Sequence, residues 1–284
     1  MIEEKGYGKI NLALRITERR HDGYHNIDTI FQSISLYDTI RLERAETFRI
    51  TCSNPSLPCD ETNLAYKAYD MLRPYCKGSD AVHIHIEKRI PLAAGLAGGS
   101  TDCAAVLRGL NRLWKLGLSY DDLCTLGSRL GADVPFCIRG GTARGTGIGE
   151  VLKFLPALPD WPVVIVHPHL AVHTGKAYSL FDEKTVTQAV DINAQEEAVR
   201  TGIIDRVIAA LGNTFEELVI PGMPELEGLK AMLHGQGLRP LMSGSGPTLF
   251  AIIPPSLRHH DVVTTLTSRV EDADIFTCQL VTGV

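Results

Sequence analysis

The pattern of apolar and polar positions predicts a β-rich start to the chain. Every second residue from Ile10 to Ile16 is apolar, which is the period typical of a half-buried strand. Lys9 and Asn11 fall on the opposite face of that strand. The Asp22-Gly23 pair predicts a tight turn after it. Further strands are predicted at residues 27–36, 39–42, 47–51 and 81–88.

Apolar residues at helical spacing predict helices at residues 64–72, 101–116 and 121–130. Ser119, with Asp122 three residues later, resembles a capping box in front of the third helix. A proline-rich stretch at 155–162 is the best candidate for a linker between domains. Beyond it we expect strands at 163–166, 249–253 and 275–281 and a helix near 260–270.

These elements predict a two-domain α/β (α+β) protein, with domains at residues 1–156 and 157–284. Hydrophobic residues make up 44% and charged residues 21% of the chain, which suits a globular protein with a sizeable core. The charge balance of 28 − 33 = −5 argues against a general surface for nucleic acid or anionic membrane. With no secretory leader and no apolar run of membrane-spanning length, we expect a cytoplasmic protein.

Cysteine and histidine positions give little sign of disulfides or a resident metal. The seven cysteines are an odd number without a CxxC pair, so we expect them to be reduced and mostly buried. His83, His85 and Glu87 share one face of a predicted strand, a set that can ligate zinc. A solvated strand face is the simpler interpretation, because the sequence identifies no further ligand. No resident metal is predicted.

A loop rich in small residues, between a predicted strand and a predicted helix, carries the clearest chemistry. Small residues let backbone N–H groups approach a ligand closely, and a helix start adds unpaired donors and partial positive charge. These features predict a phosphate cradle, although a flexible connector fits the glycine content equally well. The candidate phosphate-binding residues are Pro91, Leu92, Ala93, Ala94, Gly95, Leu96, Ala97, Gly98, Gly99, Ser100 and Thr101.

The sequence of this loop resembles the phosphate loop of the GHMP kinases. Residues 8–12 (Gly-Lys-Ile-Asn-Leu) resemble the N-terminal strand motif of that superfamily, and residues 242–250 resemble its glycine-rich C-terminal motif. Residues 20–25 and 130–136 match one branch of it. The resemblance implies an N-terminal domain like ribosomal protein S5, a C-terminal ferredoxin-like domain, and a site in the cleft between them. Alanines at 93, 94 and 97, where some relatives have glycine, are expected to leave the helix start unaffected.

The resemblance also implies the catalytic residues. Asp133, which without it is an ordinary turn cap, becomes the carboxylate that accepts a proton from the attacking hydroxyl. Lys9, otherwise a solvated strand lysine, would lie beside Asp133 and neutralise charge on the transferred phosphoryl group. ATP with Mg²⁺ is the implied cofactor, and the hydroxyl of either Ser100 or Thr101 is a candidate contact for the ion.

By the same resemblance, the acceptor is the 2-hydroxyl of a cytidylylated methylerythritol, in the non-mevalonate route to isopentenyl diphosphate. Asn11 would anchor the hydroxyl region, while Tyr24 and His25 would bind the cytidine. Tyr178 is a weaker candidate for a second ring against the cytosine, with Phe181 in competition. Alternatives are a homoserine- or mevalonate-type kinase and a non-catalytic nucleotide sensor. The partner is a small molecule, with no nucleic acid or membrane, and the protein is expected to be a monomer or weak homodimer.

Overall fold

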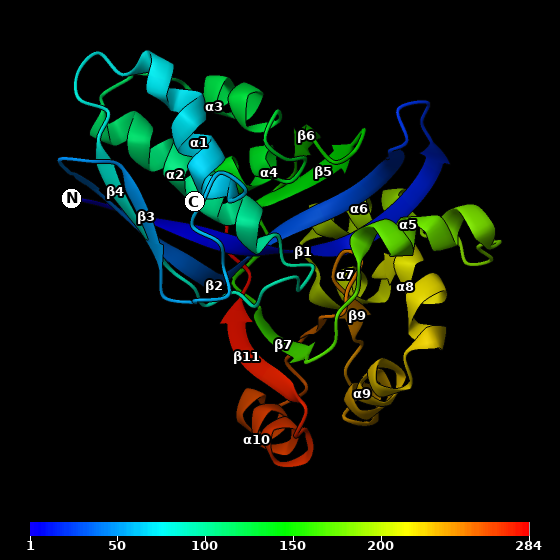
Figure 1. The fold of residues 1–284 in the computed structure, drawn as a ribbon. Coiled ribbons are helices and arrows are strands. Elements are labelled where there is room, and N and C mark those ends of the chain that lie inside the picture. The colour runs from blue at the N-terminus through cyan, green and yellow to red at the C-terminus, as the bar shows by residue number, and fades with distance from the viewer. Residues whose placement is uncertain (284) are drawn as a thin grey trace.

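A long antiparallel hairpin forms the centre of the structure, a computed structural model that describes residues 1–283 (Figure 1). Strand β1 (Ile2–Arg19) pairs with β2 (His25–Arg44) along almost its whole length. Their sheet has seven strands, in the order β3-β4-β2-β1-β8, with β5 joined to β2 and β6 to β5. The further strands are β3 (Arg49–Cys52), β4 (Val82–Glu87), β5 (Thr142–Thr146), β6 (Val151–Phe154) and β8 (Gly212–Asn213).

Helices from the first half of the chain gather on one side of this hairpin (Figure 1). Their apolar faces and the sheet form one core, which includes Phe31, Leu42, Ile84 and Leu107. The helices are α1 (Leu64–Leu72), the short 3₁₀ turn η1 (Arg73–Tyr75), α2 (Gly98–Leu113), α3 (Tyr120–Gly127) and α4 (Val134–Arg139).

The second half of the chain adds a four-stranded antiparallel sheet in the order β11-β7-β10-β9. Its strands are β7 (Pro162–Pro168), β9 (Leu241–Met242), β10 (Leu249–Ile252) and β11 (Ala273–Gln279). Its helices are α5 (Thr174–Glu183), α6 (Ile192–Thr201), α7 (Ile204–Ala209), α8 (Thr214–Val219), η2 (Ile220–Gly222), α9 (Pro224–Gly235) and α10 (His259–Arg269).

The hairpin differs from its prediction in two ways. The strands expected at 27–36 and 39–42 are one continuous strand, β2. Strand β1 is also not half-buried, because α2 covers one face while residues of the second half cover the other. Ile10 and Leu12 lie in a core with Val163 and Ile165. A strand covered on both faces places Lys9 and Asn11 in the interior as well.

Most predicted elements are present with shifted ends. Helix α2 begins at Gly98 rather than at residue 101, so the phosphate-loop candidates reach into its first turn. Helix α3 starts behind the predicted capping box of Ser119 and Asp122, which is confirmed. The six-residue helix α4 was not predicted. The domain boundary at residue 156 stays a prediction. The two halves share a sheet, since β8 of the second half pairs with β1 of the first.

The expectation for the cysteines is partly wrong. All are free thiols, but Cys59 is exposed and Cys52, Cys76 and Cys124 are only partly buried. The three buried cysteines are Cys103, Cys137 and Cys278. Within residues 1–283, none of the helices combines the length and the apolar character needed to cross a membrane.

An ionic network around the buried carboxylates Asp28 and Glu196 joins the first sheet to α6 of the second half. Arg144 on β5 donates to Asp28 at 2.7 and 2.8 Å and to Glu196 on α6 at 2.9 Å. Glu196 also accepts from Lys153 and Arg200, each at 2.8 Å. These bonds, led by that of Lys153, lower the pKa of Glu196 from 4.5 to about 2.

Because its folded pKa is depressed, Glu196 stabilises the fold above its unfolded pKa, and this contribution is lost as pH falls from about 4.5 toward 2. We expect Glu196→Gln to lower the free energy of unfolding by about 1 to 2 kcal/mol at pH 7, since Lys153 and Arg200 are partly solvent-screened. The difference from wild type should shrink below pH 4.5. Urea titrations across this range measure it, with the exposed neighbour Glu197→Gln as control; a gap that is independent of pH would contradict the assignment.

Candidate active site

The predicted site residues line a cavity of about 750 Å³ between the two halves of the chain. Its walls come from β1 and β2, the phosphate loop, the start of α4, helix α5 and the loop before β10. Predicted residues in its lining are Lys9, Asn11, Tyr24, His25, Ala93, Ala94, Gly95, Ala97, Gly98, Gly99, Ser100, Asp133 and Tyr178. Residues from both halves therefore meet at one place.

The remaining loop candidates lie elsewhere. Pro91 and Leu92 line a smaller cavity of about 230 Å³ that shares Gly98 and Gly99 with the first. Leu96 is fully buried in the core. Thr101 is also fully buried, and its hydroxyl donates to the Gly98 carbonyl at 2.8 Å. Of the two hydroxyls considered for Mg²⁺, that of Ser100 is therefore the one at the cavity.

The loop presents backbone donors at the start of α2. The intrahelical ladder begins with Thr101 N–H donating to the Ala97 carbonyl at 2.9 Å, and no side chain caps the helix. The N–H groups of Gly98, Gly99 and Ser100 consequently have no intrahelical acceptor. Such a turn attracts an anion through these donors and through the partial positive charge of the helix start.

Two alanines of this loop have a left-handed backbone conformation. Ala97 is the N-cap of α2 with φ of 59°, and Ala93 has φ of 52°. This left-handed region disfavours residues that carry a Cβ atom. Ala93 and Ala97 therefore hold a strained backbone in the loop, while α2 still begins directly after Ala97.

Lys9 and Asn11 form a buried polar pair beneath the loop. Lys9 is 4% exposed, and its Nζ donates to Asn11 Oδ1 at 2.7 Å and to the Gly95 carbonyl at 3.0 Å. Asn11 Nδ2 donates to Thr29 Oγ1 at 2.8 Å. Lys9 is thus not a solvated strand lysine. It lines the same cavity as Asp133, beside which it was expected.

Asp133 stands at the start of α4, with its side chain free of the helix. It occupies the N-cap position, yet it makes no capping hydrogen bond. Its neighbours across the cavity include Gly149, where a Cβ atom would lie 3.9 Å from Asp133 Oδ1. The ordinary Asx-cap interpretation is therefore wrong, and the carboxylate is left available to a ligand.

Aromatic rings form the other end of the cavity. His25 is 6% exposed and stacks on Tyr178 with ring centroids 4.9 Å apart, whereas Tyr24 is 62% exposed. Burial, and to a lesser degree the charge of Asp133, raises the pKa of Tyr178 to about 12. Phe181 meets the edge of His25 at 5.8 Å but does not line the cavity. Of the two candidate rings, Tyr178 is the one at the site.

Several site residues were not predicted individually. Gly244, Ser245 and Gly246 complete the wall beside Lys9, and they belong to the motif at 242–250. Asp182 on α5 contacts His25 and also lines the cavity. Asp182 had no sequence signal, since it is an ordinary acidic residue beside Glu183 on a largely exposed helix.

Asn213 supports this wall from behind. Its Nδ2 donates to the carbonyls of Met242 and Gly244 at 2.7 and 2.8 Å, and its Oδ1 caps α8 by accepting from Phe215 N–H at 3.0 Å. Gly244 N–H in turn donates to Asn11 Oδ1 at 3.1 Å. The Asn213 side chain therefore connects β8 and α8 to the polar pair beneath the phosphate loop.

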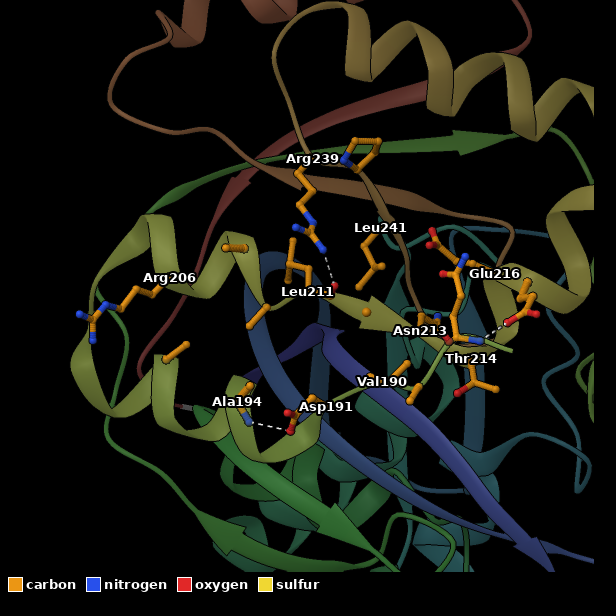
Figure 2. A pocket seen from close by; sticks show the side chains of 18 of the residues that line it. Val190, Asp191, Ala194, Arg206, Leu211, Asn213, Thr214, Glu216, Arg239 and Leu241 are labelled. Atoms are coloured by element: carbon orange, nitrogen blue, oxygen red, sulfur yellow. Dashed lines mark hydrogen bonds between the residues drawn. The ribbon is translucent and has the colours of Figure 1, made fainter. Parts of the chain in front are cut away.

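A second cavity of about 1020 Å³ lies on the far side of Asn213, between helices α6 to α9 and β9 (Figure 2). Its charged groups have both signs, and Lys230 within it is paired with Glu216 at 2.6 Å. It contains neither the glycine loops nor Asp133. The cavity of about 750 Å³ is therefore the one with the chemistry of a phosphoryl-transfer site.

His83, His85 and Glu87 lie along strand β4, where the two histidines contact side chains of the neighbouring strands. Thr51 Oγ1 lies 2.8 Å from His83 Nε2 and 2.9 Å from His85 Nδ1. His83 also approaches Glu43 at 3.3 Å. Among residues 1–283, no group of three or more His, Cys, Asp or Glu side chains is arranged to hold a metal.

Comparison with known proteins agrees with this geometry. The model of the GHMP kinases N terminal domain matches residues 63–141, which include the phosphate loop. The 4-diphosphocytidyl-2-C-methyl-D-erythritol kinase of Enterococcus faecalis is 40% identical over 95% of this chain and 96% of that protein. The namesake enzyme of Exiguobacterium sibiricum is 42% identical over 87% of each chain.

Solved structures extend the agreement to the fold. A crystal structure of 4-(cytidine 5'-diphospho)-2C-methyl-D-erythritol kinase superposes with a TM-score of 0.82 and 32% identity, over 98% of this chain and 99% of that one. The mevalonate kinase of Methanococcus jannaschii reaches a TM-score of 0.74 at 14% identity, over 99% and 98% of the chains. The second likeness concerns the fold alone.

The fold and the loop–helix site define a GHMP kinase, with the mixed two-part architecture expected from the sequence. Identity of about 40% over nearly the whole chain is more specific than this class. The chain belongs to the 4-diphosphocytidyl-2-C-methyl-D-erythritol kinase family.

We expect Asn213→Ser to keep the cap of α8 but to leave the buried carbonyls of Met242 and Gly244 without donors. Leaving buried acceptors unpaired costs about 1 to 3 kcal/mol, which denaturant titration would measure. Asn63→Ser is a matched control, because Asn63 also caps a helix while its amide meets an exposed carbonyl. Equal losses at both positions would mean that Asn213 acts only as a cap.

Proposed function

We propose that this protein transfers the γ-phosphate of ATP to the 2-hydroxyl of 4-diphosphocytidyl-2-C-methyl-D-erythritol. The observation that carries the proposal is the meeting of Lys9, Asp133 and the start of α2 in one cavity. Phosphoryl transfer needs mainly positioning and neutralisation of charge, with a carboxylate to accept the hydroxyl proton. The names of the relatives supply the acceptor.

On the nucleotide side, the phosphates of ATP would accept from the N–H groups of Gly98, Gly99 and Ser100. Lys9 would add its charge from below, since its Nζ is 3.0 Å from the Gly95 carbonyl in the same loop. The Ser100 hydroxyl is an oxygen donor that suits Mg²⁺, which takes few protein ligands beside phosphate and water. When bound, Mg²⁺ would lower the charge on the phosphates.

On the acceptor side, Asp133 would receive the proton of the 2-hydroxyl while that oxygen attacks the γ-phosphorus. Asn11, held by Lys9 and Gly244, would orient the hydroxyl region. The cytidine would lie against Tyr24 and Tyr178 at the aromatic end. His25 Nε2 is already engaged by Asp182, so His25 has only its other ring nitrogen and its backbone to offer the base.

The alternatives have less support. Homoserine and mevalonate kinases share the fold, but solved examples of them are 13 to 17% identical to this chain. A nucleotide sensor without chemistry would not require Lys9 and Asp133 together in the cavity. The predicted cytoplasmic location and the monomer or weak homodimer belong to this proposal.

A substrate panel tests the proposal directly. With MgATP, we expect the protein to release ADP in the presence of the cytidylylated methylerythritol and not with mevalonate, homoserine or galactose. The aromatic end of the cavity provides the physical reason, because only the first compound has a base to place there. Turnover of another acceptor, with the cytidylyl compound inert, would overturn the proposal.

We expect Asp133→Asn to lower kcat by about 10² to 10⁴-fold, because the amide preserves size but cannot accept the proton. Binding of ATP and acceptor should change little, since Asp133 makes no structural hydrogen bond as a helix cap. Steady-state kinetics and calorimetric titration measure the two effects. A variant with near wild-type kcat would remove Asp133 from the mechanism.

A further inference from the structure

A polar contact ties α5 to the start of β2, 157 residues earlier in the chain. Asp182 Oδ1 lies 2.8 Å from His25 Nε2, and its other oxygen lies 3.5 Å from an Arg19 guanidinium nitrogen. The side chain of His25 is 5% exposed and that of Arg19 is 62% exposed. The contact with His25 is consequently the stronger one, since solvent screens the pair with Arg19.

Helix α5 packs one face on a core of the second half, where Leu180 and Phe181 are partly buried. Ala177 is its buried residue, and Tyr178 packs edge-on against Phe215 at 5.0 Å. Tyr178 also stacks on His25 at an interplanar angle of 15°. Tyr178 and Asp182 are four residues apart, so they share one face of the helix and meet the same imidazole. The ring of His25 is therefore held on its face by Tyr178 and at its edge by Asp182.

We propose that Asp182 is a positioning residue of the cytidine subsite. It holds the His25 ring, and through that ring it keeps α5 and Tyr178 against the β1–β2 hairpin. A carboxylate only accepts, so His25 Nε2 carries the shared hydrogen and the orientation of the ring is fixed. The inference rests on the proposed function, which supplies the cytidine.

Loss of Asp182 should therefore affect the binding of the two substrates differently. Asp182 contacts His25 and Arg19 beside the aromatic rings, whereas the phosphate loop is a separate segment of the cavity lining. Loss of Asp182 should loosen the wall around the base and leave the nucleotide loop in place. A merely structural role would instead weaken both ligands together.

Kinetics of matched variants test this. We expect Asp182→Ala to raise KM for the cytidylyl substrate about 5- to 20-fold, with kcat and KM for ATP within about twofold of wild type. Asp182→Asn retains an acceptor oxygen and should stay within about threefold. Glu183→Ala removes the next carboxylate of the same helix, which is exposed and outside the cavity, and should change nothing. Calorimetry with cytidine 5'-diphosphate alone should show the same order of affinities without turnover.

A double variant identifies the route of the effect. In a His25→Ala protein, the further change Asp182→Ala should alter KM less than about twofold, because Asp182 acts through the missing ring. Additive effects, an equal rise in KM for ATP, or an Asp182→Ala protein that matches Glu183→Ala would overturn the proposal. Failure of the wild-type protein to phosphorylate the cytidylyl compound would instead refute the proposed function.

Discussion

The site depends on the close approach of two loops that lie about 150 residues apart in the sequence, at Gly95 and at Ser243–Gly246. A Cβ atom on Gly95 would clash with the Ser243 carbonyl oxygen, and the φ of 72° at Gly95 also favours glycine. Ser243 Oγ donates to the Gly95 carbonyl at 3.0 Å. Because each loop comes from a different half of the chain, this contact aligns the phosphate loop with the second half.

The same contact explains how a lysine can be buried without a carboxylate. Lys9 Nζ uses a side-chain amide oxygen and the Gly95 carbonyl as acceptors, which offset part of the cost of taking its charge out of water. Both acceptors are neutral, so neither forms an ion pair with Lys9. On the proposed function, a polyphosphate in the cavity would bring negative charge to this lysine.

The sequence predicted what local patterns encode. Alternation at Ile10–Ile16 and the capping box at Ser119 depend on neighbouring residues, and both elements are present. Helix α2 begins three residues before its predicted start, because Gly98 and Gly99 are poor helix formers and carry no helical pattern in the sequence. The burial of both faces of β1 was missed, since it depends on residues that come 150 positions later.

The site residues also fall into those that the sequence predicts and those that only the fold reveals. Lys9, Asp133 and the phosphate loop can be found from the sequence, because each lies within a short motif that resembles one of a known superfamily. Asn213 and Asp182 lie on elements of ordinary composition, and only the fold brings them to Gly244 and His25. The groups proposed to touch reacting atoms therefore lie in local motifs, whereas the groups proposed to hold them in place are brought there by the topology. On that proposal, specificity for the base would belong to the second kind, because it would depend on how α5 lies against the hairpin.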